Sequence, residues 1–223
     1  MDLWILFVFI LLPFVFSFIF AFVIFYTKAF GLGVLLFLCL FSLVSVLLSS
    51  FLQVFTCPIS KTQSLFFSSY LHSALIEECI KCTIFYFSLL IFVPEARNRK
   101  DVYKYNSNVF EKSLFELFMF AMFFASSFSA FENISYFLLE TKTLPIRIFT
   151  SSFLHILIAP YYLLVLSKHK KYNILLFLIV PILLHGTYNL FMKLGNVFFA
   201  SIIIIFLILR NIIVLSKQNN HLS

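Results

Sequence analysis

Two adjacent carboxylates, Glu77 and Glu78, lie inside a sequence that is otherwise almost wholly apolar and extends from Leu65 to Val93. A run of this length can cross a bilayer as a single helix. Charged carboxylates inside a membrane helix cost several kcal/mol each unless they are paired. Lys81 follows Glu77 by four residues and Glu78 by three, so both acids can reach its ammonium on one helical face. We therefore expect the sequence EExxK to be the centre of the chemistry.

Three later apolar segments also carry polar groups at membrane depth. These groups are Glu132, Asn133, Tyr136, His155, His185 and Asn189. Glu132 and Tyr136 are four residues apart, as are His185 and Asn189, so each pair shares a helical face. A rise of about 1.5 Å per residue places these groups and the glutamate pair in one layer, between the midplane and the outer face of the membrane. We expect a single water-accessible polar site inside a helical bundle.

This combination of side chains favours hydrolysis. A carboxylate in apolar surroundings can act as a general base, and of two neighbouring carboxylates one can hold a proton while the other accepts one. A histidine and an asparagine can donate hydrogen bonds to a tetrahedral oxyanion. Alternatively, His155, His185 and Glu132 could ligate zinc, because two histidines and a carboxylate form a known catalytic ligand set. The sequence has no HExxH motif, so hydrolysis with a divalent metal and hydrolysis without one both remain open.

Non-catalytic interpretations use the same residues. Glu77 and Lys81 could form only an ion pair within one helix, and His185 with Asn189 only hydrogen bonds between helices. The chain would then be a membrane scaffold that binds transmembrane partners. The layer of Glu and His could also be the relay of a proton-coupled transporter. Against transport, the sequence has no internal repeat and no pair of Gly- or Pro-broken helices in matching halves.

The elements that must position these groups are long apolar segments. Of the 223 residues, 62% are hydrophobic and 11% are charged, whereas about 25% of a soluble domain is charged. With a mean hydropathy of +1.06, the chain is predicted to be an integral membrane protein. We expect an all-α transmembrane bundle in a single domain, 1–223, with its first apolar segment retained as a membrane helix. The seven predicted spans cover about residues 3–26, 29–55, 65–93, 114–139, 144–167, 173–193 and 197–215.

The net charge of +7 reflects membrane topology rather than nucleic-acid binding. The Lys and Arg residues lie in short loops between apolar segments, and no soluble basic segment interleaved with aromatic residues is present. Most of them follow the first, third and fifth spans or lie near the C-terminus. The positive-inside rule therefore predicts an N-terminus outside and a C-terminus in the cytoplasm.

Four motifs, taken in order, are similar to those of a known protein family. They are EECIK at 77–81, FENISY at 131–136, His155, and HGTYN at 185–189. This set resembles the PrsW family of intramembrane proteases, relatives of the CAAX prenyl endopeptidase and of bacteriocin-processing membrane enzymes. The resemblance implies the helical-bundle fold of that superfamily. It also implies a bacterial cytoplasmic-membrane location and a membrane-anchored protein substrate, such as an anti-sigma factor, cleaved near the outer side.

The resemblance also assigns roles within the site. The implied catalytic residues are Glu77, Glu78, Glu132, His155, His185 and Asn189, with Lys81, Asn133 and Tyr136 in support. A glutamate of the adjacent pair would activate water, Glu132 and His155 would complete the site, and His185 with Asn189 would stabilise the transition state. The family is also described as metalloprotease-like, so the expected cofactor is either none or a divalent metal such as zinc.

Overall fold

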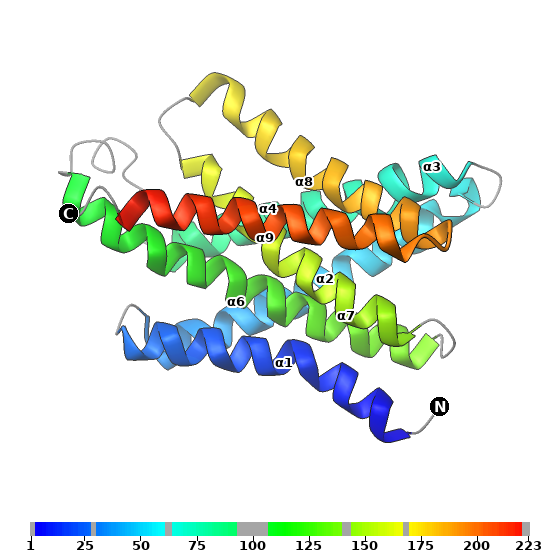
Figure 1. Ribbon diagram of the computed structural model, residues 1–223, viewed down its shortest axis with the longest axis horizontal. Helices are drawn as coiled ribbons and strands as arrows, with labels where there is room; N and C mark the ends of the chain where they lie inside the picture. Colours follow the sequence, from blue (N-terminus) through cyan, green and yellow to red (C-terminus); the bar gives the residue numbers. More distant parts are fainter. Residues whose placement is uncertain are drawn as a thin grey trace.

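The computed structural model of the protein describes residues 3–27, 30–60, 64–92, 107–139, 144–166 and 170–219. Within these ranges every regular element is a helix (Figure 1). The elements are α1 (Leu3–Tyr26), α2 (Leu32–Ser60), α3 (Leu65–Phe67), η1 (Ser68–Leu75), α4 (Ile76–Phe92), α6 (Ser107–Leu139), α7 (Leu144–Ile158), η2 (Ala159–Leu166), α8 (Lys170–Lys193) and α9 (Val197–Asn219). The prediction of an all-α fold is therefore confirmed for these residues, and the helices overlap the predicted spans.

Several of these helices are apolar enough to lie in a membrane. Leu32–Thr56 and Phe115–Tyr136 are long and apolar enough to cross one, and Leu11–Tyr26, Phe149–Leu163 and Val197–Ile213 are shorter apolar helices. Many large apolar side chains also point outward, including Phe18 and Phe22, which are 74% and 70% exposed. Such a surface is unfavourable in water and suits contact with lipid. The seven-span topology, its orientation and the single domain over 1–223 stay predictions.

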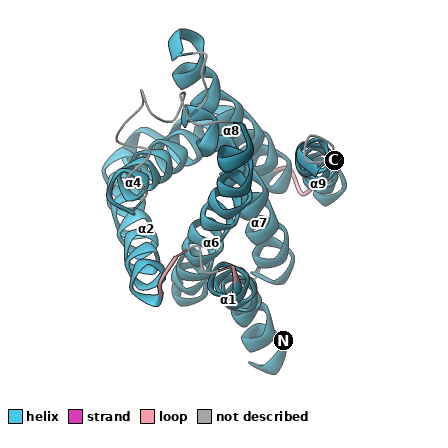
Figure 2. Cartoon of the chain, turned by 90° about the vertical axis from the view of Figure 1, so that its left-hand side faces the viewer, coloured by secondary structure: helices cyan, strands magenta, loops and turns pink. Residues whose placement is uncertain are grey.

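Helix α6 forms the centre of the bundle and contacts α1, α2, α7 and η2 (Figures 1 and 2). Its buried face combines phenylalanines with small residues, which allow neighbouring helices to approach closely. The Ser126 hydroxyl lies 2.8 Å from the Ser17 hydroxyl of α1, and the Ser42 hydroxyl of α2 donates to the Phe124 carbonyl at 2.9 Å. These hydrogen bonds fix α6 between the two N-terminal helices and orient its polar residues toward α7.

Two helical stretches depart from α-helical geometry beside the centre of the bundle. Segment η1 is a π-helix that runs directly into α4, and π-helical turns are frequently found at functional sites. Segment η2 continues α7 as a 3₁₀-helix from Ala159, next to Pro160, which has no N–H for an α-helical hydrogen bond. The Asn211 side chain of α9 donates to the Leu157 carbonyl at this junction, at 3.0 Å. Both stretches bring side chains to the polar centre described next.

Candidate active site

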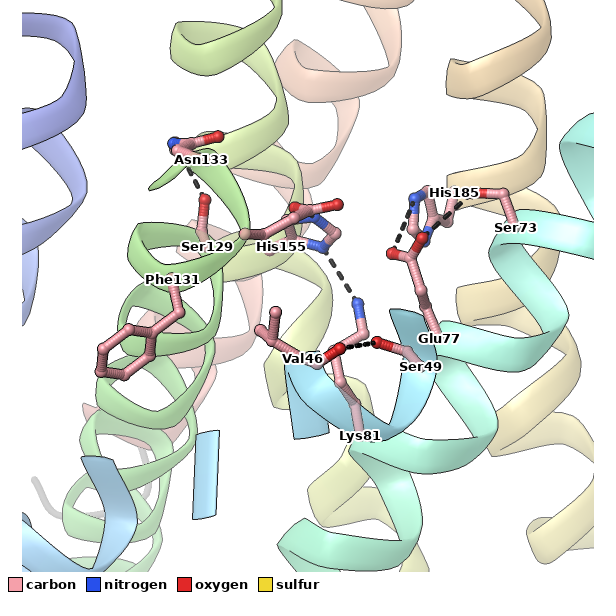
Figure 3. A network of polar contacts seen from close by, with 12 residues as sticks. Val46, Ser49, Ser73, Glu77, Lys81, Ser129, Phe131, Asn133, His155 and His185 are labelled. Carbon is pink, nitrogen blue, oxygen red and sulfur yellow. Dashed lines mark hydrogen bonds and ion pairs between the residues drawn. The ribbon is translucent and has the colours of Figure 1, made fainter. Parts of the chain in front are cut away.

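Ionisable side chains from four helices meet in the interior of the bundle. They are Glu77, Glu78 and Lys81 of α4, Glu132 of α6, His155 of α7 and His185 of α8. None is more than 8% exposed. Figure 3 shows Lys81 and Glu77 of α4 directed toward His155 of α7 and His185 of α8. The structure thus brings together groups that the sequence placed in a single layer.

The Glu78 carboxylate is saturated with hydrogen-bond donors. Its Oε1 accepts from Lys81 Nζ at 2.5 Å and from His185 Nδ1 at 2.7 Å. Its Oε2 accepts from the Tyr162 hydroxyl of η2 at 2.5 Å. Of the two acids that could reach Lys81, the structure pairs it with Glu78, three residues before it. A buried charge pair with this many hydrogen bonds is well compensated.

Lys81 also connects Glu78 to a third carboxylate, that of Glu132. Its Nζ lies 3.0 Å from His155 Nδ1, and His155 Nε2 lies 2.8 Å from Glu132 Oε2. An ammonium has only hydrogens to donate, so His155 Nδ1 is the acceptor in this contact. His155 Nε2 then carries the ring hydrogen and donates a hydrogen bond to Glu132 Oε2. The result is a neutral His155 whose orientation is fixed at both ring nitrogens.

Glu77 is held at only one of its two oxygens. Its Oε1 accepts from Gln53 Nε2 at 2.9 Å and from the Ser73 hydroxyl at 3.1 Å. Its Oε2 is buried and has no hydrogen-bond partner among the described residues. This oxygen faces His185 Nε2 at 3.7 Å. Most buried polar atoms in proteins are hydrogen-bonded, so this oxygen is a candidate position for a bound water molecule or ion.

His185 presents a matching lone pair. Its Nδ1 lies against a carboxylate, Glu78 Oε1, and therefore acts as the donor of that hydrogen bond. In the neutral ring, the lone pair is then on Nε2 and points toward Glu77 Oε2. Two acceptors that face each other do not bond to each other. The hydrogens of a water molecule, a shared proton or a cation between them would satisfy both atoms.

The residues around this gap fit a divalent metal. Ligand atoms of Glu77, His155 and His185 all lie within 4.8 Å of one another, and two histidines with one carboxylate form a known catalytic zinc set. Each histidine also has one nitrogen held by a further carboxylate, Glu132 or Glu78, as is usual for histidines that bind metals. His155 would exchange one of its present contacts for the metal. Glu132 was the predicted carboxylate ligand, whereas Glu77 is the one that the structure groups with both histidines.

The other predicted residues lie on either side of this centre. The Asn189 amide donates to the Ser73 hydroxyl at 3.0 Å, which places it on the Glu77 side. The Asn133 amide donates to the Ser152 hydroxyl at 3.1 Å and so links α6 to α7. Tyr136 is half-buried and lies one turn beyond Glu132 on α6. Asn189 is therefore close to the paired glutamates, and Asn133 supports the position of α7.

The glycine of the HGTYN motif has a packing role. The ring of Tyr70, on η1, lies against Gly186, and a Cβ added there would overlap the ring carbons. The Tyr70 hydroxyl lies 2.7 Å from the Thr187 hydroxyl, which adds a polar contact to the same interface. Glycine is thus required because η1 approaches the α8 backbone closely. This approach brings Ser73 within reach of Asn189.

Three residues of the network were missed by the sequence-based prediction. Gln53 and Ser73 contact Glu77, and Tyr162 contacts Glu78. A signal existed for the first two, because Gln53 is a strongly polar residue in an apolar span and Ser73 precedes Glu77 by four residues. Tyr162 gave a weaker signal, since an α-helical projection does not describe a 3₁₀-helical stretch.

The described residues form an all-helical bundle with a buried centre of glutamates and histidines, and most of the sequence is similar to one protein family. The family model for PrsW family intramembrane metalloproteases matches residues 21–214, which is most of the chain. The protein belongs to this family, so the resemblance found in the motifs is confirmed. No curated protein and no solved structure matches the chain. Family membership makes the protein an integral membrane protein of an intramembrane peptidase family, and it supports a role in hydrolysis.

Proposed function

We propose that the protein is an active intramembrane endopeptidase that hydrolyses a peptide bond of a membrane-associated protein. The observation that carries this proposal is the buried Glu77 Oε2, which has no hydrogen-bond partner among the described residues and lies 3.7 Å from His185 Nε2. A water molecule between them would donate to both atoms while its oxygen lone pair attacks a carbonyl carbon. A family of intramembrane proteases provides the matching reaction class.

Three residues have separate roles in the proposed hydrolysis. Glu77 Oε2 accepts the proton of the attacking water, because its other oxygen is already occupied by two donors. Glu78 fixes the tautomer of His185 through the Nδ1 hydrogen bond. The Asn189 amide nitrogen carries two hydrogens, of which one is given to Ser73. We assign the second hydrogen to the developing oxyanion.

The same centre supports a metal-dependent version of the reaction. Glu77, His155 and His185 would hold the divalent ion, of which zinc is the best match to this ligand set. When bound, such an ion supplies a Lewis acid and lowers the pKa of water. Glu132 and Glu78 would keep the two histidine rings oriented.

Metal removal distinguishes the two versions. We expect phenanthroline to abolish cleavage by the purified protein in detergent, and a stoichiometric addition of Zn²⁺ to restore it, because the ligand set and the family description agree. A non-chelating phenanthroline isomer is the control for the added aromatic compound. Unchanged cleavage after chelation would assign water activation to Glu77 without a metal.

The substrate is proposed to be a membrane-anchored protein, such as an anti-sigma factor, in a bacterial cytoplasmic membrane. This part of the proposal is supported by the similarity to the PrsW family and by the position of the polar layer, which is nearer the predicted outer face.

The proposal is tested by comparing membrane-released peptides from cells that contain equal amounts of the wild-type protein or of the Glu77→Gln variant. Quantitative proteomics should find fragments that end in or near a transmembrane segment only with the wild-type protein. Glu116→Gln is the matched control, since Glu116 is a half-buried glutamate on α6 and lies outside the network. Identical peptide sets for all three proteins would overturn the proposal and favour a scaffold.

A further inference from the structure

Glu77 Oε1 is held by two donors that come from different parts of the chain. Gln53 Nε2 reaches it from α2 at 2.9 Å, and the Ser73 hydroxyl reaches it from η1 at 3.1 Å. The terminal torsion of a glutamate is broad, so a carboxylate without such partners has no fixed direction. With both donors on Oε1, the other oxygen is the one that faces His185.

We propose that Gln53 and Ser73 are positioning residues for the reaction, and that together they aim Glu77 Oε2 at the attacking water. The inference rests on the proposed function, because it assigns a role to two residues that act through the proposed base. Neither residue belongs to the motifs that identify the family. Both form their contacts only because α2, η1 and α4 converge beside α8.

Ser73 also determines where the oxyanion donor lies. A hydroxyl has a single hydrogen, and a carboxylate can only accept, so the hydrogen of Ser73 is given to Glu77. Its lone pair then accepts from Asn189 Nδ2 at 3.0 Å, which is the direction that the contact requires. One hydroxyl on the π-helix therefore sets the distance between the base and the group that stabilises the oxyanion.

Gln53 is itself anchored from the same segment. His72, the neighbour of Ser73, places its Nε2 2.9 Å from the Gln53 backbone carbonyl. Segment η1 thus contacts Gln53 at its backbone and shares the Glu77 oxygen with its side chain. A movement of η1 would therefore disturb both Gln53 and Ser73. The orientation of Glu77 depends on how this single segment packs against its neighbours.

The experiment measures kcat and KM in proteoliposomes. The reporter carries a transmembrane segment that is cleaved with the wild-type protein and not with Glu77→Gln. Ser73→Ala should lower kcat by about 10- to 100-fold, the range for losing a group that orients a catalytic ligand, and change KM less than about 2-fold. Ser73→Thr keeps the hydroxyl and should restore kcat to within about 3-fold of the wild-type value.

Matched controls separate positioning from a general loss of structure. Ser88→Ala removes a buried hydroxyl of α4 that donates to the Phe85 carbonyl of the same helix, and kcat should not change. Gln53→Met preserves the length of the side chain without its donor and should lower kcat as Ser73→Ala does. Ser45→Ala, on the same helix as Gln53, removes a hydroxyl that donates to the Phe41 carbonyl of α2 and should have no effect.

The outcomes distinguish this inference from the proposed function. Wild-type kcat in both Ser73→Ala and Gln53→Met, with Glu77→Gln inactive, would overturn the positioning role and leave the peptidase in place. A rise in KM with unchanged kcat would also overturn it, since the residues would then contact substrate. If Ser73→Ala does not fold, Gln53→Met and Ser73→Thr decide the result. Equal behaviour of the wild-type protein and Glu77→Gln would remove the proposed function and this inference with it.

Discussion

The two adjacent glutamates both lie beside His185 of α8, but the rest of their surroundings differ. Glu78 accepts hydrogen bonds from Lys81 of α4, His185 of α8 and Tyr162 of η2, which occupy both of its oxygens. Glu77 faces α2, η1 and α8, where one oxygen is clamped and the other has no donor among the described residues. Successive residues of an α-helix point about 100° apart, so one helix can serve both regions.

The difference separates a structural task from a chemical one. The Glu78 region has complete hydrogen bonding and a buried ion pair, which makes it rigid. The Glu77 region keeps an unsatisfied oxygen that costs stability and is retained only where another group can bind. We infer that a pair of neighbouring acids is useful here because one acid builds the site and the other remains available to react.

The largest expected effect tests this division directly. Glu77→Gln should lower the cleavage rate by at least about 100-fold, the contribution expected from a general base, with little change in the unfolding midpoint in detergent. Glu78→Gln should instead destabilise the fold strongly, because Lys81 would lose its carboxylate partner in the interior. The measurements are reporter cleavage and urea-induced unfolding of both variants. Equal loss of stability in the two variants would contradict the comparison.

The next effect concerns the buried ion pair. Lys81→Met should lower the free energy of unfolding by about 3–5 kcal/mol, because Glu78 would remain charged and buried without its cation. The double variant Glu78→Gln with Lys81→Met should cost clearly less than the sum of the single changes, since it removes both charges. The double-mutant cycle is measured by urea unfolding in detergent. Strictly additive losses would show that the pair does not stabilise the Glu78 region.

Tyr162 allows a smaller change on the saturated side. Tyr162→Phe removes the hydroxyl that donates to Glu78 Oε2 and should cost about 1.5–3 kcal/mol of stability, as expected for a hydrogen bond to a charged group. Tyr161→Phe is the control, because the neighbouring ring lies over Arg210 instead of entering the site. Thermal unfolding of the two variants compares them. A Tyr162→Phe variant as stable as Tyr161→Phe would weaken the claim that Glu78 needs all three donors.

The smallest expected effect lies on the Glu77 side. Gly186→Ala should push Tyr70 away from α8 and cost about 1–3 kcal/mol by overpacking, with a fall in activity as Ser73 moves from Asn189. Gly33→Ala, in α2, meets nothing within 4 Å and should be neutral or slightly stabilising. Thermal unfolding and reporter cleavage are measured on both variants. A fully active Gly186→Ala would show that the η1–α8 contact does not position the site.

Much of this arrangement could be predicted from the sequence, because long apolar segments and ionisable residues within them are strong signals. The spans of the bundle followed from hydropathy, and the convergence of Glu77, Glu132, His155 and His185 followed from their similar depths. The split between Glu77 and Glu78 could not be predicted, because it depends on which neighbouring helix lies on each side of α4. The roles of Tyr162 and Ser73 could not be predicted for a related reason. Turns of 3₁₀- and π-helix change the direction of side chains relative to an α-helical projection.

The π-helical segment η1 has a consequence for how this protein can vary in length. It holds Tyr70 against Gly186 and Ser73 against Glu77, while its first residues continue from a helix capped by Ser64. Deleting one residue between Ser68 and Leu75 would convert the wide turn to an α-helical one and rotate the preceding side chains by about 100°. The number of residues in η1 is therefore as constrained as their identity. We therefore expect that Leu71, whose side chain is 43% exposed, can be substituted by another apolar residue but cannot be deleted.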